Sequence, residues 1–87
     1  MYQFSQPGPN LIASSSGRTL EILGRAGLRY HVNGVAIEID SEMLHPPMSL
    51  VIYSDSIPMG TPLPASEILE ETIKALEYAG FTVEVIS

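Results

Sequence analysis

The sequence predicts an α+β domain: a small, mainly antiparallel sheet of four to six strands with one C-terminal helix packed across one face, followed by a final strand. Three observations predict it: two alternating runs joined by Asn33-Gly34, an apolar stripe at helical spacing in residues 66–79, and an alternating run from Phe81 to Ile86. With 87 residues and 45% apolar content, residues 1–87 should form a single domain. Residues 2–17 are rich in Ser, Gly, Pro and Gln, and residues 1–10 are expected to be flexible.

The clearest local signal is the hairpin predicted from Leu28 to Asp40. Asn33-Gly34 tolerates the positive φ angles of a two-residue turn, and a two-residue loop fixes the register. That register pairs six apolar side chains on one face, in the couples Val32 with Val35, Tyr30 with Ile37, and Leu28 with Ile39. On the opposite face Arg29 lies across from Glu38, so burial and charge favour the same register.

Further strands are predicted at 11–13, 19–23, 48–53 and 81–86. Residues 48–53 are apolar on both faces, which favours the centre of the sheet. Residues 40–47 end in Pro46-Pro47 and are expected to form a loop, and the prolines and glycine of 54–64 predict an irregular segment. The last strand follows the helix, so both parallel pairing and an antiparallel place at an edge remain open.

The helix is expected to start at Ser66, a good N-cap residue, and to stop at Gly80 after about 14 residues. Its apolar stripe consists of Ile68, Leu69, Ile73, Leu76 and Ala79. The predicted outer face carries Glu67, Glu70, Glu71, Lys74 and Glu77. This helix should therefore lie across the sheet with an acidic surface toward solvent.

Charge and composition exclude several classes of function. The net charge of −6 argues against nucleic acid, and residues 31–87 alone carry nine acids and one lysine, net −8. No apolar run approaches the roughly 20 residues of a membrane-spanning helix, and the first residues lack a secretory signal. The absence of cysteine excludes disulfides and thiolate sites and fits the cytoplasm.

No pattern of catalytic or cofactor-binding residues is present. His31 and His45 match no local metal-ligand spacing, and His31 is expected on the polar face of its strand. Ser14-Ser15-Ser16-Gly17 is expected to be a polar loop, without the flanking strand and helix of a phosphate site. We therefore expect no metal, no cofactor and no enzymatic activity.

Four segments resemble the immunity protein 74 family of small bacterial proteins. They are Gly27-Leu28-Arg29-Tyr30, Asp40-Ser41-Glu42-Met43-Leu44, Val51-Ile52-Tyr53-Ser54-Asp55-Ser56-Ile57 and Gly80-Phe81-Thr82-Val83-Glu84-Val85, within residues 19–86. The resemblance implies a cytoplasmic protein that binds and neutralises a secreted or injected bacterial toxin. One departure is Pro58-Met59-Gly60-Thr61, where the family pattern often has a tryptophan.

An acidic surface suits a basic protein toxin, because complementary charge speeds association. The candidate partner-binding residues are Asp40, Glu42, Tyr53 and Asp55, followed by Glu67 and Glu71 of the helix. Tyr53 joins the set because it ends a strand where an irregular segment begins, whereas Tyr30 is predicted in the core. The alternative is a small homo-oligomeric structural or regulatory domain, such as a homodimer formed by pairing exposed sheet edges.

Overall fold

The computed structural model describes residues 3–44, 49–58 and 60–87. The strands in this part of the chain are β1 (Phe4–Gly8), β2 (Leu11–Ser14), β3 (Thr19–Ile22), β4 (Ala26–Val32), β5 (Val35–Leu44), β6 (Ser49–Tyr53) and β7 (Thr82–Ile86). The helices are the 3-10 helix η1 (Ser54–Ser56) and the α-helix α1 (Ala65–Tyr78). The predicted α+β class is confirmed, but the sheet has seven strands rather than four to six.

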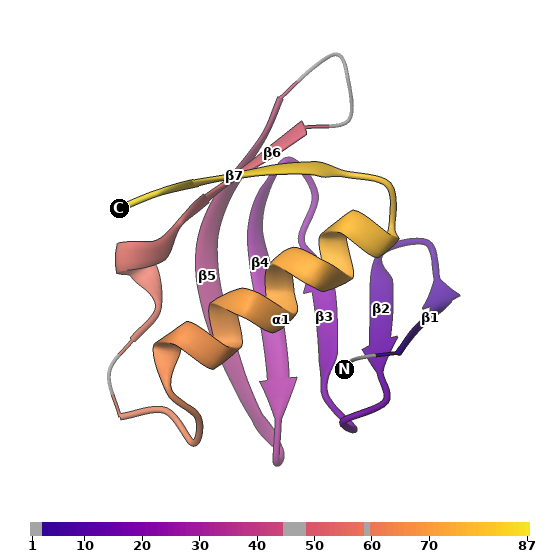
Figure 1. The fold of residues 1–87 in the computed structure, drawn as a ribbon, viewed down its shortest axis with the longest axis vertical. Helices are drawn as coiled ribbons and strands as arrows, with labels where there is room; N and C mark the ends of the chain where they lie inside the picture. Colours follow the sequence, from indigo (N-terminus) through magenta and orange to yellow (C-terminus); the bar gives the residue numbers. More distant parts are fainter. Residues whose placement is uncertain (1–2, 45–48, 59) are drawn as a thin grey trace.

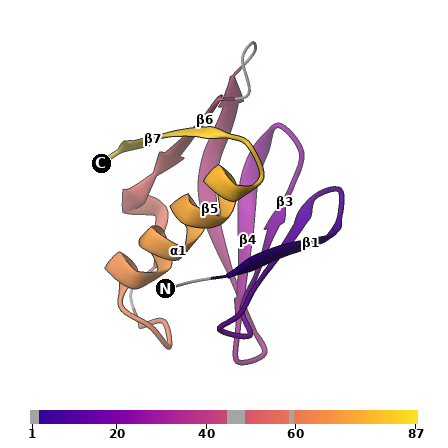
Figure 2. The ribbon, with the colours of Figure 1, turned by 45° about the vertical axis from the view of Figure 1, so that its right-hand side comes forward.

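All strands lie in one sheet in chain order, β1 to β7, and each neighbouring pair is antiparallel except the parallel pair β6–β7. The helix α1 is the crossover between these two strands and lies across one face of the sheet (Figure 1). The sheet curls around this helix, as Figure 2 shows. The predicted central place for residues 48–53 is wrong, because β6 is next to the edge strand β7.

The predicted hairpin is confirmed in position and register. Asn33 has φ 51° and Gly34 φ 77°, as a primed turn requires, and each predicted couple is a cross-strand pair of β4 and β5. Arg29 Nη2 lies 3.3 Å from Glu38 Oε2 across the same strands. One side chain departs from the prediction: Val35 borders the turn at the end of the sheet and is 44% exposed, so it does not join the core.

Two segments for which no strand was predicted form strands. Residues 4–8 form β1, because their backbone pairs with β2 and the Phe4 ring packs at 5.8 Å from that of Tyr78. Residues 40–44 extend β5, because they pair with β6 as far as Leu44 opposite Ser49. Residues 45–48, including His45, lie outside the described residues.

The helix begins earlier than predicted and ends where predicted. The carbonyl of Pro64 accepts the backbone N–H groups of Glu67 and Ile68, so Pro64 is the N-cap and Ser66 is not. At the other end Gly80 has φ 101°, and the N–H of Phe81 donates to the carbonyl of Leu76 at 3.0 Å. This is the left-handed glycine cap that satisfies the last helical carbonyls.

One apolar core fills the space between α1 and the sheet. Its buried members are Ile12, Leu20, Ile22, Leu28, Tyr30, Val32, Ile37, Ile39, Leu50, Ile52, Ile57, Ile68, Ala75 and Leu76. Alternate residues of β3, β4 and β5 point into this core, as the period-two pattern predicts. In the described part of the chain, no helix combines the length and apolarity needed to cross a bilayer.

The helix buries one polar atom without a partner: Thr72 Oγ1 has no hydrogen bond among the described residues, and Thr72 is fully buried. Replacing this threonine with the similarly shaped valine removes an unsatisfied hydroxyl and adds a methyl group. We expect Thr72→Val to raise the free energy of unfolding by about 1 kcal/mol in urea denaturation. Destabilisation by this substitution would indicate that the hydroxyl is hydrogen-bonded in solution.

Candidate functional site

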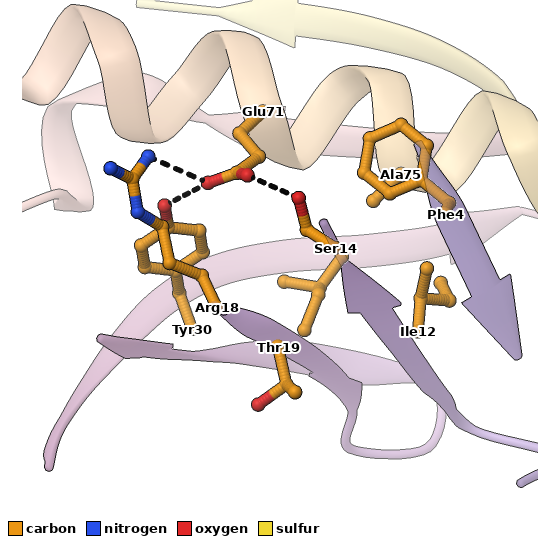
Figure 3. Close-up of a pocket in the computed structure, with 9 residues that line it drawn as sticks. Phe4, Ile12, Ser14, Arg18, Thr19, Tyr30, Glu71 and Ala75 are labelled. Carbon is orange, nitrogen blue, oxygen red and sulfur yellow. Dashed lines mark hydrogen bonds and ion pairs between the residues drawn. The ribbon is translucent and has the colours of Figure 1, made fainter. Parts of the chain in front are cut away.

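The most heavily bonded polar group in the interior is the Glu71 carboxylate of α1, which is only 2% exposed. Its Oε2 accepts the hydroxyls of Ser14 and Ser16, each at 2.7 Å. Its Oε1 accepts the hydroxyl of Tyr30 and, at 3.2 Å, Nη1 of Arg18. Ser14 belongs to β2, Ser16 and Arg18 to the turn that follows β2, and Tyr30 to β4. Figure 3 shows Ser14, Arg18 and Tyr30 converging on Glu71 beneath the helix. We call these five residues the Glu71 network.

The network keeps Glu71 ionised despite its burial. Burial alone would raise the pKa of this carboxyl, but hydrogen bonds from Tyr30, Ser14, Ser16 and Arg18 outweigh it and lower the pKa below its ordinary value of 4.5. Burial raises the pKa of Tyr30, and the neighbouring carboxylate raises it further. The phenol therefore keeps its proton and donates a hydrogen bond to Glu71. The network is therefore one buried negative charge held by neutral donors and one arginine.

This arrangement suits a stabilising contact between two segments rather than a reaction centre. Both oxygens of Glu71 are saturated by donors, and the adjacent cavity of about 10 Å³ has room for one water at most. The network fastens the turn between β2 and β3 to α1. The prediction that Glu71 lies on the exposed face of the helix is wrong. Its spacing indicates a buried position, because Glu71 lies three residues after Ile68 and four before Ala75, and both of these face the core.

Glu67, the other helical candidate, lies at the rim of this network. Its Oε2 is 3.1 Å from Nη1 of Arg18, and its side chain is 40% exposed. Both helical acids predicted to bind a partner, Glu67 and Glu71, therefore form ion pairs with Arg18. The predicted polar loop Ser14–Gly17 is also part of this network, through the two serine hydroxyls.

The four other candidates lie near one another around the β5–β6 pair, away from the Glu71 network. Asp40 and Glu42 of β5 alternate with inward-facing residues, so both point away from α1. Tyr53 ends β6 and its hydroxyl is 3.4 Å from Glu42 Oε1. Asp55 lies in η1, which is fastened to β5 because Ser56 Oγ accepts the N–H of Asp40 at 2.8 Å.

The edge strand adds two residues that sequence reasoning did not select. Val51 of β6 is paired in register with Glu42 on one side and Glu84 of β7 on the other, so the three share a cross-strand row. Ile86 is paired with Tyr53 two residues further along. We name Asp40, Glu42, Tyr53, Asp55, Glu84 and Ile86 the acidic sheet face. Glu84 and Ile86 join this face because β7 pairs in parallel with β6, and the sequence left that pairing open.

The acids of this face have no cationic partner among the described residues. Arg18 is engaged by Glu67 and Glu71, and Arg29 lies 3.6 Å from Glu21 and 3.3 Å from Glu38, further along the same face. Arg25 lies at the rim, since its carbonyl accepts the N–H of Met43, but no ion pair joins it to these acids. The acidic sheet face thus holds four carboxylates without a cationic partner in the described part of the chain, together with the exposed Tyr53.

No group of three or more His, Asp and Glu side chains is placed to hold a metal ion within residues 3–44, 49–58 and 60–87. His31 lies on the polar face of β4, as predicted, with Nε2 3.4 Å from Glu21 Oε1. Comparison of the chain with family models, with curated proteins and with solved structures gives no match.

Proposed function

We propose that this protein is an immunity protein that acts in the cytoplasm, where its acidic sheet face binds a basic bacterial toxin and neutralises it without catalysis. The observation that carries the proposal is the acidic sheet face, whose four carboxylates have no cationic partner within residues 3–44, 49–58 and 60–87. The resemblance of residues 19–86 to immunity protein 74 supports the same role. Three of the four segments that carry the resemblance contribute residues to this face.

The composition of the face suits protein recognition. Tyr53 is 36% exposed and Ile86 44%, and aromatic residues are enriched at the centres of protein interfaces. Surrounding carboxylates would steer a basic partner and raise its association rate, an effect that salt screens. A rigid strand scaffold holds these groups in place, so binding needs little ordering of this protein. We therefore expect fast, salt-sensitive association.

If the adjacent gene encodes a toxin, co-expression with that toxin tests the proposal. The protein should restore growth of cells that produce the toxin and should be recovered with it in a pull-down. Tyr53→Ala should weaken the purified complex about tenfold or more, as truncation of an interface anchor does, while Tyr78→Ala, which removes an exposed tyrosine of α1, should change it little. Unchanged toxicity together with no recovered complex would refute the proposal.

A second candidate is a homo-oligomeric structural or regulatory domain. The observation that favours it is β7, an edge strand with Val85 and Ile86 at least 40% exposed. Against it, pairing two copies at this edge brings two acidic sheet faces close together. Light scattering across a dilution series separates the candidates, because a stable dimer together with no toxin gene nearby favours the second.

A further inference from the structure

The two edges of the sheet differ in how well they resist pairing with another chain. β1 contains Pro7, which has no N–H to offer, and its register with β2 is irregular between Ser5 and Gly8. Both features are devices that proteins use to protect an edge strand. β7 has neither: its five residues pair with β6 in an unbroken parallel register. No described segment pairs with the other side of β7.

β7 also presents two chemically different rows of side chains. Val83 and Val85 are paired with Leu50 and Ile52, so they lie on the face that α1 covers. Glu84 and Ile86 lie on the acidic sheet face. A strand added beside β7 would therefore have the apolar Val83 and Val85 as neighbours on one face, and Glu84 between Thr82 and Ile86 on the other.

We propose that the outer edge of β7 binds an extended segment of the partner as an additional strand, one that alternates apolar and basic residues. This inference rests on the proposed function and specifies how the partner binds. The basic side chains of the added segment lie beside Glu84, and Glu42 lies in the same row, two strands further from the edge than Glu84. The apolar side chains of the segment lie beside Val83 and Val85. Backbone hydrogen bonds supply affinity and the alternating side chains supply specificity.

Charge decides between this occupant and a second copy of the chain. The chain carries −6 overall, and its acidic sheet face holds four carboxylates without a described cation. A second β7 in the same place would bring another Glu84 and another acidic sheet face, and like charges across neighbouring strands are unfavourable. A basic strand instead makes Glu84 a favourable cross-strand partner and brings positive charge to the side of the sheet that carries the other acids.

The test uses the whole protein and blocked hexapeptides. One peptide alternates lysine and valine, a second alternates glutamate and valine, and a third replaces the valines of the first with proline. Amide hydrogen exchange is followed residue by residue by NMR. We expect the lysine–valine peptide to slow the exchange of the outward-facing β7 amides about tenfold, with no change in the hairpin at Asn33-Gly34, and the other two peptides to give no protection.

Charge reversal on the strand supplies the matched comparison. Glu84→Lys should abolish protection by the lysine–valine peptide and create protection by the glutamate–valine peptide, whereas Glu70→Lys on the exposed face of α1 should leave both results as in the parent protein. Lack of binding, or binding without β7 protection, would overturn the inference. So would protection that rises with protein concentration alone, which identifies a second copy as the occupant.

The two proposals fail separately. If the protein neutralises its toxin while the peptides leave the β7 amides unprotected, the toxin uses another part of the acidic sheet face and only the strand-addition inference falls. If the lysine–valine peptide protects β7 but the protein neither binds nor neutralises the toxin, the proposed immunity function falls and the edge site remains.

Discussion

Glu71→Gln is expected to lower the free energy of unfolding by about 3–5 kcal/mol, the usual cost of removing one member of a buried ion pair. Glutamine fits the same space, but its amide N–H₂ would face hydroxyl and guanidinium donors instead of accepting from them. A chain of 87 residues has a total stability of about 4–13 kcal/mol, so this single change removes a large part of it.

Chemical denaturation of three glutamine variants on the same helix measures the effect. Glu70→Gln, at an exposed position, should change the free energy of unfolding by less than about 0.5 kcal/mol. Glu67→Gln, which loses a partly exposed ion pair with Arg18, should cost up to about 1 kcal/mol. Equal stabilities for all three would contradict the structural role of the Glu71 network.

The same network predicts a loss of stability in acid. Because the pKa of Glu71 is lower in the folded protein than the ordinary 4.5, its contribution is complete above that value and is lost as the pH falls through the folded pKa. Unfolding free energies measured from pH 6 to pH 3 should therefore fall less steeply for Glu71→Gln than for the parent protein.

Arg18→Met is expected to cost about 2–4 kcal/mol at pH 7, because it leaves the Glu71 carboxylate buried without its cation. In this variant burial still raises the pKa of Glu71 while one of the groups that lower it is gone. Glu71 then takes up a proton at a higher pH than in the parent protein. The cost of the substitution should therefore shrink as the pH falls toward 4.

Arg29→Met is the matched control, since Arg29 forms its ion pairs with Glu21 and Glu38 at the solvent-exposed face of the sheet. Its cost at pH 7 should stay within about 1 kcal/mol. An Arg18→Met cost no greater than that of Arg29→Met at pH 7 would show that Arg18 is not needed to hold the Glu71 charge.

The local patterns of the sequence predicted the elements whose structure depends on neighbours in the chain. Asn33-Gly34 specifies its own turn, and alternation on either side specifies the register that pairs Arg29 with Glu38. Gly80 specifies the end of α1 through its left-handed conformation. Such features need no knowledge of distant segments, which explains why they were predicted correctly.

Features that depend on distant contacts were missed. The propensities of residues 4–8 favour a loop, but pairing with β2 and the contact of Phe4 with Tyr78 stabilise a strand there. Glu71 looked like a solvated helical acid because Ser14, Arg18 and Tyr30 are far from it in sequence. A glutamate within an apolar stripe is the warning that the pattern did contain.

For the candidate site, the sequence identified four residues that lie near one another around the β5–β6 pair and two that lie elsewhere. Asp40, Glu42, Tyr53 and Asp55 are close in sequence to one antiparallel pair of strands, so their proximity follows from that pairing. Glu84 became part of the site only through the parallel place of β7. That place is determined by how α1 crosses the sheet rather than by any local signal.

The central claim is that the acidic sheet face, and not the acidic helix, binds the toxin. The most direct test measures the dissociation constant of the purified complex for two double variants of equal charge change, Glu42→Lys with Asp55→Lys and Glu70→Lys with Glu77→Lys. We predict that the sheet-face variant weakens binding about a hundredfold and that the helix variant stays within about threefold of the parent protein. Equal weakening by both variants, or weakening by the helix variant alone, would contradict the claim.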